Sequence, residues 1–204
     1  MTDGLLYENQ AHSAGFQTVC GIDEAGRGPL AGPVFAAAVI LPEGFAVEGI
    51  DDSKKLTPKK REALFGEIAK NAIWGIGFAT EGEIDQVNIL QATFLAMKRA
   101  FDALNVRPDF ALVDGNQMPS LGVKTQTVIR GDSLSESVAA ASILAKVSRD
   151  RLMVEIDRIY PEYGFAKHKG YGTAYHRAML KKYGPCPVHR RTFLRHILGG
   201  SDCE

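Results

Sequence analysis

Short apolar runs alternate with longer amphipathic stretches along this chain of 204 residues. Five runs are short enough for strands and are bounded by Pro, Gly or charged residues: 18–23, 34–41, 73–80, 110–115 and 124–129. Helical spacing of apolar residues, or a helix-start signal, covers 57–71, 84–104 and 135–151, with short basic helices around 173–183 and 189–198. Strands interleaved with helices in this way predict a mixed α/β domain after a loose or partly helical lead-in at 1–17.

Two helix starts carry recognisable signals. Thr57 followed by Pro58 is typical of an N-cap with proline at the first helical position. Ser133 and Glu136 have the spacing of a capping box, which predicts that the long helix begins near them. Small residues on one face of 135–151 would let that helix pack closely on a sheet.

Composition narrows the class of protein. Hydrophobic residues make up 45% and charged residues 24%, which is ordinary for a globular domain, and no apolar run is long enough to span a membrane. The first residues lack a signal peptide, and three scattered cysteines fit neither a zinc site nor a disulfide framework. We therefore predict one cytoplasmic domain over 1–204, with a core at about 18–160 and a basic helical region at about 161–198.

Charge is unevenly distributed although the net charge is zero. Residues 1–162 carry 16 Lys and Arg against 22 Asp and Glu, whereas residues 163–204 carry eight against two. A basic region beside an acidic body suggests a polyanion that meets a cation site. A solvated basic face is the alternative on charge alone.

Four carboxylates follow apolar runs or precede a helix: Asp23, Glu24, Asp114 and Asp132. Asp23 and Glu24 cannot both face a core, because side chains alternate along a strand and an unpaired buried charge is costly. Oxygen ligands without nearby His or Cys select Mg²⁺ or Mn²⁺, and two such ions can stabilise the attacking and leaving oxygens of a phosphoryl displacement. Taken singly, each could be a turn or helix-start residue. Asp150 is a rival fourth acid, although it should lie a few turns into the helix with an arginine on either side, and Lys146 could orient a carboxylate or form a structural ion pair.

The sequence that carries Asp23 and Glu24 is Gly-Ile-Asp-Glu-Ala-Gly-Arg-Gly-Pro-Leu-Ala-Gly-Pro-Val. It closely resembles the opening motif of the bacterial type of ribonuclease HII, and later stretches match the same family in order over about 19–193. The resemblance implies a ribonuclease H fold, in which the first three of five strands are antiparallel and the last two add in parallel. It also implies that Asp23, Glu24, Asp114 and Asp132 are the catalytic, metal-holding acids.

The resemblance further implies substrate-binding residues in three motifs: Gly26, Arg27, Gly28, Ser53, Lys54 and Tyr171. Glycines let a backbone approach a ligand closely, and the family's glycine segment contacts the 2′-hydroxyl, the group that separates RNA from DNA. The glycine spacing also fits a dinucleotide fingerprint, but Pro29 and Pro33 would spoil the helix that such a site needs. A further stretch, 189–193, is compatible with phosphate contact or with packing.

The implied activity is an endoribonuclease that cuts the RNA strand of RNA–DNA hybrids. It would also incise 5′ to single ribonucleotides in duplex DNA, leaving 3′-hydroxyl and 5′-phosphate ends, and we expect a monomer that uses Mn²⁺ or Mg²⁺. A non-catalytic hybrid-binding module is the alternative, although it would not need four acids. Ribonuclease HIII is a second alternative, and the few residues before Val19 leave no room for its N-terminal extension.

Overall fold

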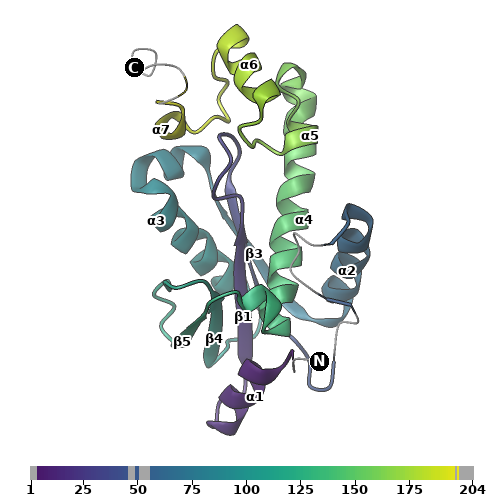
Figure 1. Ribbon diagram of the computed structural model, residues 1–204. Coiled ribbons are helices and arrows are strands. Elements are labelled where there is room, and N and C mark those ends of the chain that lie inside the picture. The colour runs from purple at the N-terminus through teal and green to yellow at the C-terminus, as the bar shows by residue number, and fades with distance from the viewer. Residues whose placement is uncertain (1–3, 46–48, 51–55, 196, 198–204) are drawn as a thin grey trace.

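A five-stranded sheet forms the centre of the computed structural model, which describes residues 4–45, 49–50, 56–195 and 197 (Figure 1). The strand order is β3-β2-β1-β4-β5. The strands span Val19–Ala25 (β1), Val34–Ile40 (β2), Ile73–Ala79 (β3), Phe110–Asp114 (β4) and Lys124–Val128 (β5). The first three are antiparallel and the last two add in parallel, which confirms the predicted mixed sheet.

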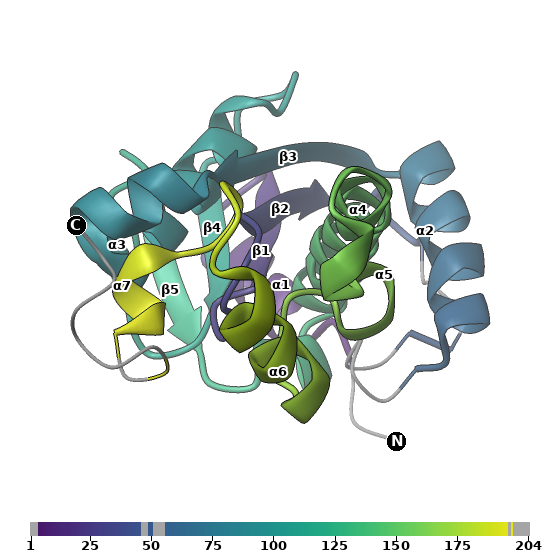
Figure 2. The ribbon, with the colours of Figure 1, turned by 90° about the horizontal axis from the view of Figure 1, so that it is seen from above.

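Helices cover both faces of this sheet. Figure 2 shows α3 on one side and α4 with α2 on the other; these helices span Glu81–Asp102 (α3), Glu136–Ile159 (α4) and Pro58–Asn71 (α2). In β2, Ala36 and Ala38 pack into the α3 side, whereas Ala37 and Val39 pack into the α4 side. Both faces of β2 are buried, and this explains why its sequence is an unbroken apolar run.

The start of α4 lies directly against β1. A Cβ atom at Gly21 would fall 2.2 Å from the carbonyl carbon of Ser137, so only glycine fits there. Ser135 is the N-cap, and its hydroxyl accepts a hydrogen bond from the Val138 amide. The predicted capping box is therefore wrong, because Ser133 lies in a preceding 3₁₀ turn, η1 (Gly131–Ser133). The helix also runs to Ile159, eight residues beyond the predicted end.

The boundaries of α3 differ from the predicted ones in a similar way. It begins at Glu81 rather than at residue 84, because Thr80 and Glu83 form a capping box that the sequence analysis missed. Asn88 interrupts the helix with φ of 71°, and its side-chain oxygen accepts from the amides of Leu90 and Gln91. The side chain thus caps the second half of the helix, from Ile89 onward.

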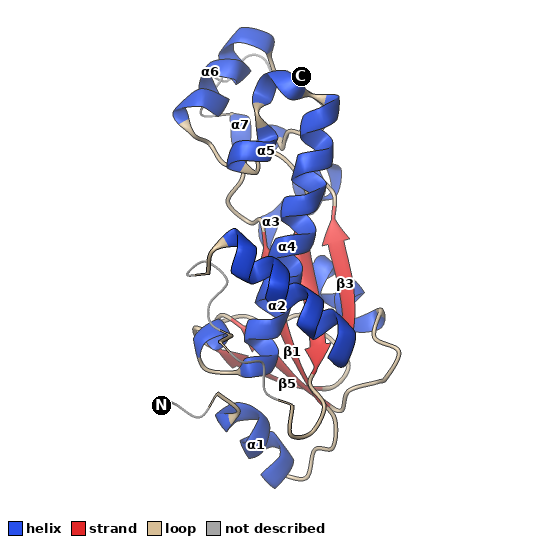
Figure 3. Cartoon of the chain, turned by 90° about the vertical axis from the view of Figure 1, so that its right-hand side faces the viewer, coloured by secondary structure: helices blue, strands red, loops and turns tan. Residues whose placement is uncertain are grey.

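The end of α4 carries a small layer of short helices that we call the C-terminal layer: η2 (Pro161–Tyr163), α5 (Phe165–His168), α6 (Ala174–Tyr183) and α7 (Arg191–Leu194). Met153 and Ile156 of α4 pack with Phe165, Leu180 and Leu194 of this layer, so one face of the last turns of α4 is buried. The expected lead-in forms α1 (Leu6–Ser13) at the opposite end of the molecule (Figure 3). Among the described helices, none is both long and apolar enough to cross a membrane.

Candidate active site

Asp23 and Asp114 lie side by side on neighbouring strands. In the parallel register, Ile22 of β1 pairs with Val113 of β4. The carboxylates of the next residues, Asp23 and Asp114, therefore lie at the same end of the two strands. Both face the side of the sheet that α4 covers, because Gly21 lies under that helix and Leu112 packs against Val138. β1 continues to Ala25, two residues past the predicted end, and so Asp23 and Glu24 belong to the strand itself.

The remaining two acids approach from either side of this pair. The Gly131 amide donates to Oδ1 of Asp114 at 2.7 Å, which folds η1 back onto β4 and brings the buried Asp132 beside it. Glu24 is less buried and pairs with the Arg27 guanidinium at 3.4 Å. We call Asp23, Glu24, Asp114 and Asp132 the carboxylate quartet.

The four acids of the quartet share one electrostatic environment. Burial raises the pKa of Asp23 well above its usual range, and the negative charges of Glu24, Asp114 and Asp132 raise it further. A buried group of like charges of this kind is relieved by a divalent cation, and oxygen ligands suit Mg²⁺ or Mn²⁺. Within the described part of the chain, no group of three or more carboxylate, imidazole or thiol side chains is arranged to hold a metal ion. The donor chemistry of the quartet nevertheless fits a hard cation.

Asp150, the rival fourth acid, lies on α4 and has its own partner. Its Oδ1 accepts from the Lys146 ammonium at 2.7 Å, one helical turn away. The carboxylates that raise the pKa of Asp23 are those of the quartet. This arrangement favours Asp132 over Asp150.

The structure brings two predicted recognition segments together. One is the glycine loop, residues 26–33 between β1 and β2, and the other is the tyrosine loop, residues 169–172. The Leu30 amide donates to the Gly170 carbonyl at 2.8 Å, and a Cβ atom at Gly28 would lie 3.7 Å from the ring of Tyr171. Tyr171 is 45% exposed, so its ring is available to a ligand beside residues 26–28. Ser53 and Lys54 lie outside the described residues, and their predicted role stays a prediction.

Two buried arginines hold the glycine loop, and the sequence analysis did not identify their role. Arg190 belongs to the stretch for which phosphate contact and packing were both open, and it is fully buried against the loop. Arg149 is equally buried on α4. Arg149 lies four residues after Ala145 and seven after Ser142. This helical spacing places it on the same face of α4 as the small residues, which could be predicted from the sequence.

A chain of neutral histidines supports the tyrosine loop. His189 and His176 are joined through their Nε2 atoms at 3.0 Å, and Nδ1 of His176 bonds the Tyr171 carbonyl at 3.0 Å. The Cys186 amide donates to Nδ1 of His189 at 3.0 Å, so His189 donates through Nε2 and His176 accepts there. Burial lowers the pKa of both rings to about 4. Each imidazole therefore stays neutral and keeps a defined direction of hydrogen bonding.

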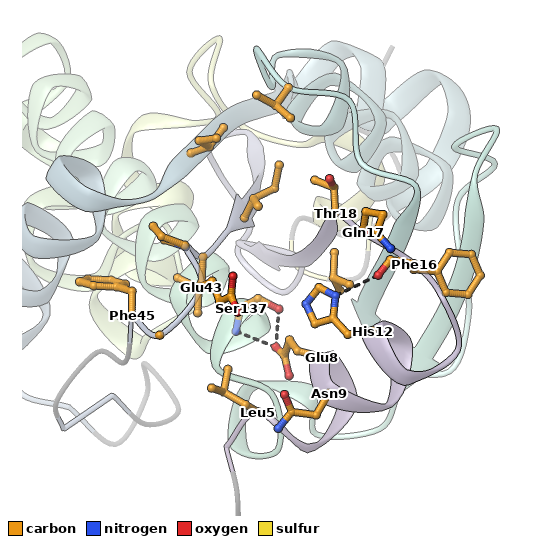
Figure 4. A pocket seen from close by; sticks show the side chains of 17 residues that line it. Leu5, Glu8, Asn9, His12, Phe16, Gln17, Thr18, Glu43, Phe45 and Ser137 are labelled. Carbon is orange, nitrogen blue, oxygen red and sulfur yellow. Dashed lines mark hydrogen bonds between the residues drawn. The ribbon is translucent and has the colours of Figure 1, made fainter.

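A cavity of about 650 Å³ lies at the opposite end of the sheet, between α1 and the start of β1 (Figure 4). Its lining includes Glu8, whose Oε1 accepts from the hydroxyls of Ser135 and Ser137, each at 2.6 Å, and from the Ser137 amide at 3.0 Å. None of the predicted site residues lines this cavity. Its buried carboxylate caps the first turn of α4 from outside the helix.

Comparisons with known proteins find relatives over most of the chain. A model of the family described as Ribonuclease HII matches residues 20–197. The Ribonuclease HII of Caldicellulosiruptor bescii is 55% identical over 192 residues, covering 94% of this chain and 93% of that protein. The Ribonuclease HII of Geobacter sulfurreducens is 56% identical over 201 residues, with coverages of 97% and 93%.

A solved structure shows the same fold. The crystal structure of the ribonuclease H2 from Pyrococcus horikoshii OT3 superposes with a TM-score of 0.73 at 29% sequence identity, covering 89% of this chain and 97% of that one. The fold prediction and the resemblance drawn from the opening motif are thereby confirmed. Matched by a family model over most of its length and sharing more than half of its residues with such relatives, this chain belongs to the ribonuclease HII family of enzymes.

Proposed function

We propose that this enzyme is an endoribonuclease that hydrolyses the RNA strand of RNA–DNA hybrids and incises 5′ to single ribonucleotides in duplex DNA. Its products are a 3′-hydroxyl and a 5′-phosphate. Support comes from the family and from one observation above all, the convergence of four carboxylates beside an exposed tyrosine and a glycine loop. A deoxyribonuclease would need the acids, but it would not need a surface that recognises the 2′-hydroxyl of a ribose.

The quartet would hold two Mg²⁺ or Mn²⁺ ions. Divalent cations at this place supply charge stabilisation for the attacking and leaving oxygens of an in-line displacement. The protein contributes the positions of the ligands: strand pairing sets Asp23 against Asp114, and the Gly131 amide fixes the orientation of the Asp114 carboxylate. Positioning and charge neutralisation then account for catalysis without a covalent intermediate.

The two recognition loops would read the nucleotide at the cleavage site. Gly28 lies next to the Tyr171 ring, so a sugar placed across the two loops would meet backbone amides of one loop and the aromatic ring of the other. Arg27 is half exposed and can reach a phosphate. A ribonucleotide differs from a deoxyribonucleotide at this point only by its 2′-hydroxyl, which the amides can recognise directly.

A cleavage assay on a DNA duplex with one embedded ribonucleotide, labelled at one end, tests the proposal. It compares Mg²⁺, Mn²⁺ and chelator for the wild type, for Asp114→Asn and for the matched control Asp102→Asn. Asp102 is an exposed aspartate that pairs with Lys98 at 2.7 Å on the surface of α3. We expect one metal-dependent nick 5′ to the ribonucleotide, lost in Asp114→Asn and kept in Asp102→Asn.

Two outcomes contradict the proposal in different ways. A wild-type protein that binds the duplex but cuts it with neither metal would be a hybrid-binding module. An Asp114→Asn variant that cuts as well as the wild type would leave the reaction standing but place the metal ligands elsewhere.

A further inference from the structure

Arg149 and Arg190 are buried, and among the described residues no carboxylate is hydrogen-bonded to either of them. Buried arginines in proteins are usually paired with a carboxylate, because an uncompensated charge is costly. Here neither guanidinium donates to any described carboxylate; every hydrogen bond they make goes to a backbone carbonyl. Glu81 and Asp85 lie close enough to attract Arg190, but the oxygens of Asp85 accept from the 191–192 segment.

The carbonyls that the two arginines bind belong almost entirely to the glycine loop. Arg190 donates from Nη2 to Gly26 at 2.6 Å, from Nη1 to Arg27 at 2.9 Å and from Nε to Gly32 at 2.8 Å. Arg149 donates from Nε to the carbonyl of residue 33 at 3.0 Å and from Nη2 to that of residue 31 at 3.1 Å. Five carbonyls of one eight-residue loop are thus turned toward two cations behind it.

Arg149 also joins the two recognition loops. Its Nη1 donates to the Lys169 carbonyl at 3.0 Å, and Lys169 has a left-handed backbone with φ of 52°. The next residue, Gly170, lies so close to the glycine loop that a Cβ atom there would fall 2.4 Å from the Ala31 carbonyl oxygen. The glycine loop itself reaches from the end of β1 up to the C-terminal layer (Figure 1).

The amides of the glycine loop behave differently from its carbonyls. The amides of Leu30 and Gly32 donate to the carbonyls of Gly170 and Val188, at 2.8 and 2.9 Å. Those of residues 26–28 donate to no other described group. With the carbonyls drawn inward by the guanidiniums, these three amides are left for a ligand beside Tyr171.

We propose that Arg149 and Arg190 are positioning residues for substrate recognition, which hold the glycine loop against the tyrosine loop with the amides of residues 26–28 facing the nucleotide. This assignment rests on the proposed function of the same site. The arginines touch no acid of the quartet through a hydrogen bond. Their loss should therefore weaken substrate binding more than it slows the chemical step.

Arginine-to-lysine variants separate geometry from charge. Lysine keeps the positive charge but cannot donate to three carbonyls in a fixed plane, as a guanidinium does. For Arg149→Lys and Arg190→Lys we expect KM for the single-ribonucleotide duplex to rise at least about tenfold, since hydrogen bonds to a charged group are lost. We expect kcat to change by less than about threefold, because the metal ligands are left in place.

A neighbouring arginine provides a matched control. Arg151 lies on the same helix as Arg149 but is exposed and pairs with Glu62 at 2.5 Å. Arg151→Lys should leave KM and kcat at their wild-type values.

Amide hydrogen exchange supplies a readout that does not depend on cleavage. In the lysine variants, the Leu30 and Gly32 amides should lose at least about tenfold of their protection. The Ile22 amide in the middle of β1 should keep its own, which distinguishes a loosened loop from general destabilisation. Unchanged KM together with unchanged exchange at Leu30 and Gly32 would overturn the proposal.

Amide exchange also tests the proposal when the wild type does not cleave and when the lysine variants do not fold. If the wild type does not cleave, the proposed function fails, yet exchange at Leu30 still reports whether the arginines hold the loop. If neither lysine variant folds, wild-type exchange decides: protection of Leu30 and Gly32 comparable to that of Ile22 supports a held loop. Exchange as fast as in an open loop refutes it.

Discussion

Two acids of the carboxylate quartet, Asp23 and Glu24, directly precede the glycine loop in sequence, but different interactions hold the quartet and the loop. Asp23 and Asp114 are set by strand pairing, and Asp132 by a hydrogen bond from the residue beside it to Asp114. The glycine loop is held instead by side chains that lie more than 100 residues away along the chain, Arg149 and Arg190. The proposed metal ligands thus depend on the sheet, whereas the proposed recognition loops depend on α4 and the C-terminal layer.

The two regions also differ in what they contribute to stability. The quartet gathers like charges around a buried aspartate, which costs free energy until a cation binds. In the recognition loops, by contrast, five carbonyls are bonded to guanidiniums, and the histidines behind the tyrosine loop are bonded to one another. The proposed metal ligands thus lower stability, whereas these hydrogen bonds stabilise one conformation of the loops.

Asp23→Asn should give the largest effect on activity. It should also separate the function of the quartet from its effect on stability. Cleavage is expected to fall by about a thousandfold, or ~4 kcal/mol of transition-state stabilisation, because a metal ligand becomes neutral. The free energy of unfolding, measured with chelator at pH 7, should be equal to or higher than that of the wild type. The asparagine can still accept from the Glu24 amide, as Asp23 does at 2.7 Å.

The pH dependence of that stability difference provides the check. Since the pKa of Asp23 is raised in the folded chain, the wild type pays a folding cost above the unfolded value of 3.8 that grows with pH up to the raised value. The advantage of Asp23→Asn should therefore shrink as pH falls toward 4. A variant that is less stable than the wild type at pH 7 would show that the quartet is not electrostatically strained.

How far the site could be predicted follows from the same contrast. Each acid of the quartet stands next to a short apolar run or a helix start, and such local patterns place strands and their ends well. The hydrogen bonds from Arg149 and Arg190 to the glycine loop could not be predicted from local patterns. The residues around each arginine in sequence do not indicate which loop its side chain contacts. Only the small-residue spacing before Arg149 shows that its side chain faces inward.

The capping boxes show where local patterns fail. Thr80–Glu83 and Ser133–Glu136 have the same spacing, yet only the first forms the box. At the second, Gly131 is held by Asp114 and starts a 3₁₀ turn, so the helix begins two residues later at its own N-cap, Ser135. A tertiary contact decides between two acceptable starts, and the sequence pattern carries no information on that contact.

Glu8→Ala should give the next largest effect, a loss of stability. It also tests whether the quartet is held by the sheet alone. Glu8 accepts from three donors at the start of α4. Its removal leaves two of them buried without an acceptor, since the Ser135 and Ser137 hydroxyls can form only one hydrogen bond with each other. We expect a loss of about 3 kcal/mol in the free energy of unfolding and a fall in Tm of ~6–12 °C. Chemical and thermal unfolding measure both quantities.

Cleavage by Glu8→Ala at low temperature tests whether the quartet is held locally. Asp132 lies in η1, whose turn is closed by its own backbone bonds, such as that from the Leu134 amide to the Gly131 carbonyl at 3.0 Å. Activity at 20 °C should thus fall by less than about tenfold. A larger fall would mean that α1 positions Asp132, while Glu43→Ala, an exposed change in the same cavity, should alter neither property.

The pair His176 and His189 should give the smallest effect, a loss of stability that occurs only at acid pH. A histidine with a lower pKa in the folded chain binds fewer protons when folded, so its stabilising effect is complete above pH 6.5 and is lost as pH falls toward 4. Between pH 7.5 and 5.5 we expect each of His176 and His189 to cost about 1 kcal/mol of unfolding free energy. Denaturant titrations at several pH values measure the slope.

Variants assign that slope to the pair. His176→Asn retains a donor for the Tyr171 carbonyl but has no titrating ring, and should make stability less dependent on pH between 5.5 and 7.5. His12→Gln, at an exposed histidine outside the pair that bonds the Phe16 carbonyl, is the control. Since protonation of His176 would set two donors against each other at 3.0 Å, the tyrosine loop should loosen first. Exchange at the Leu30 amide should then quicken at pH 5.5 before the sheet amides respond, and equal responses would place the acid-sensitive groups in the sheet instead.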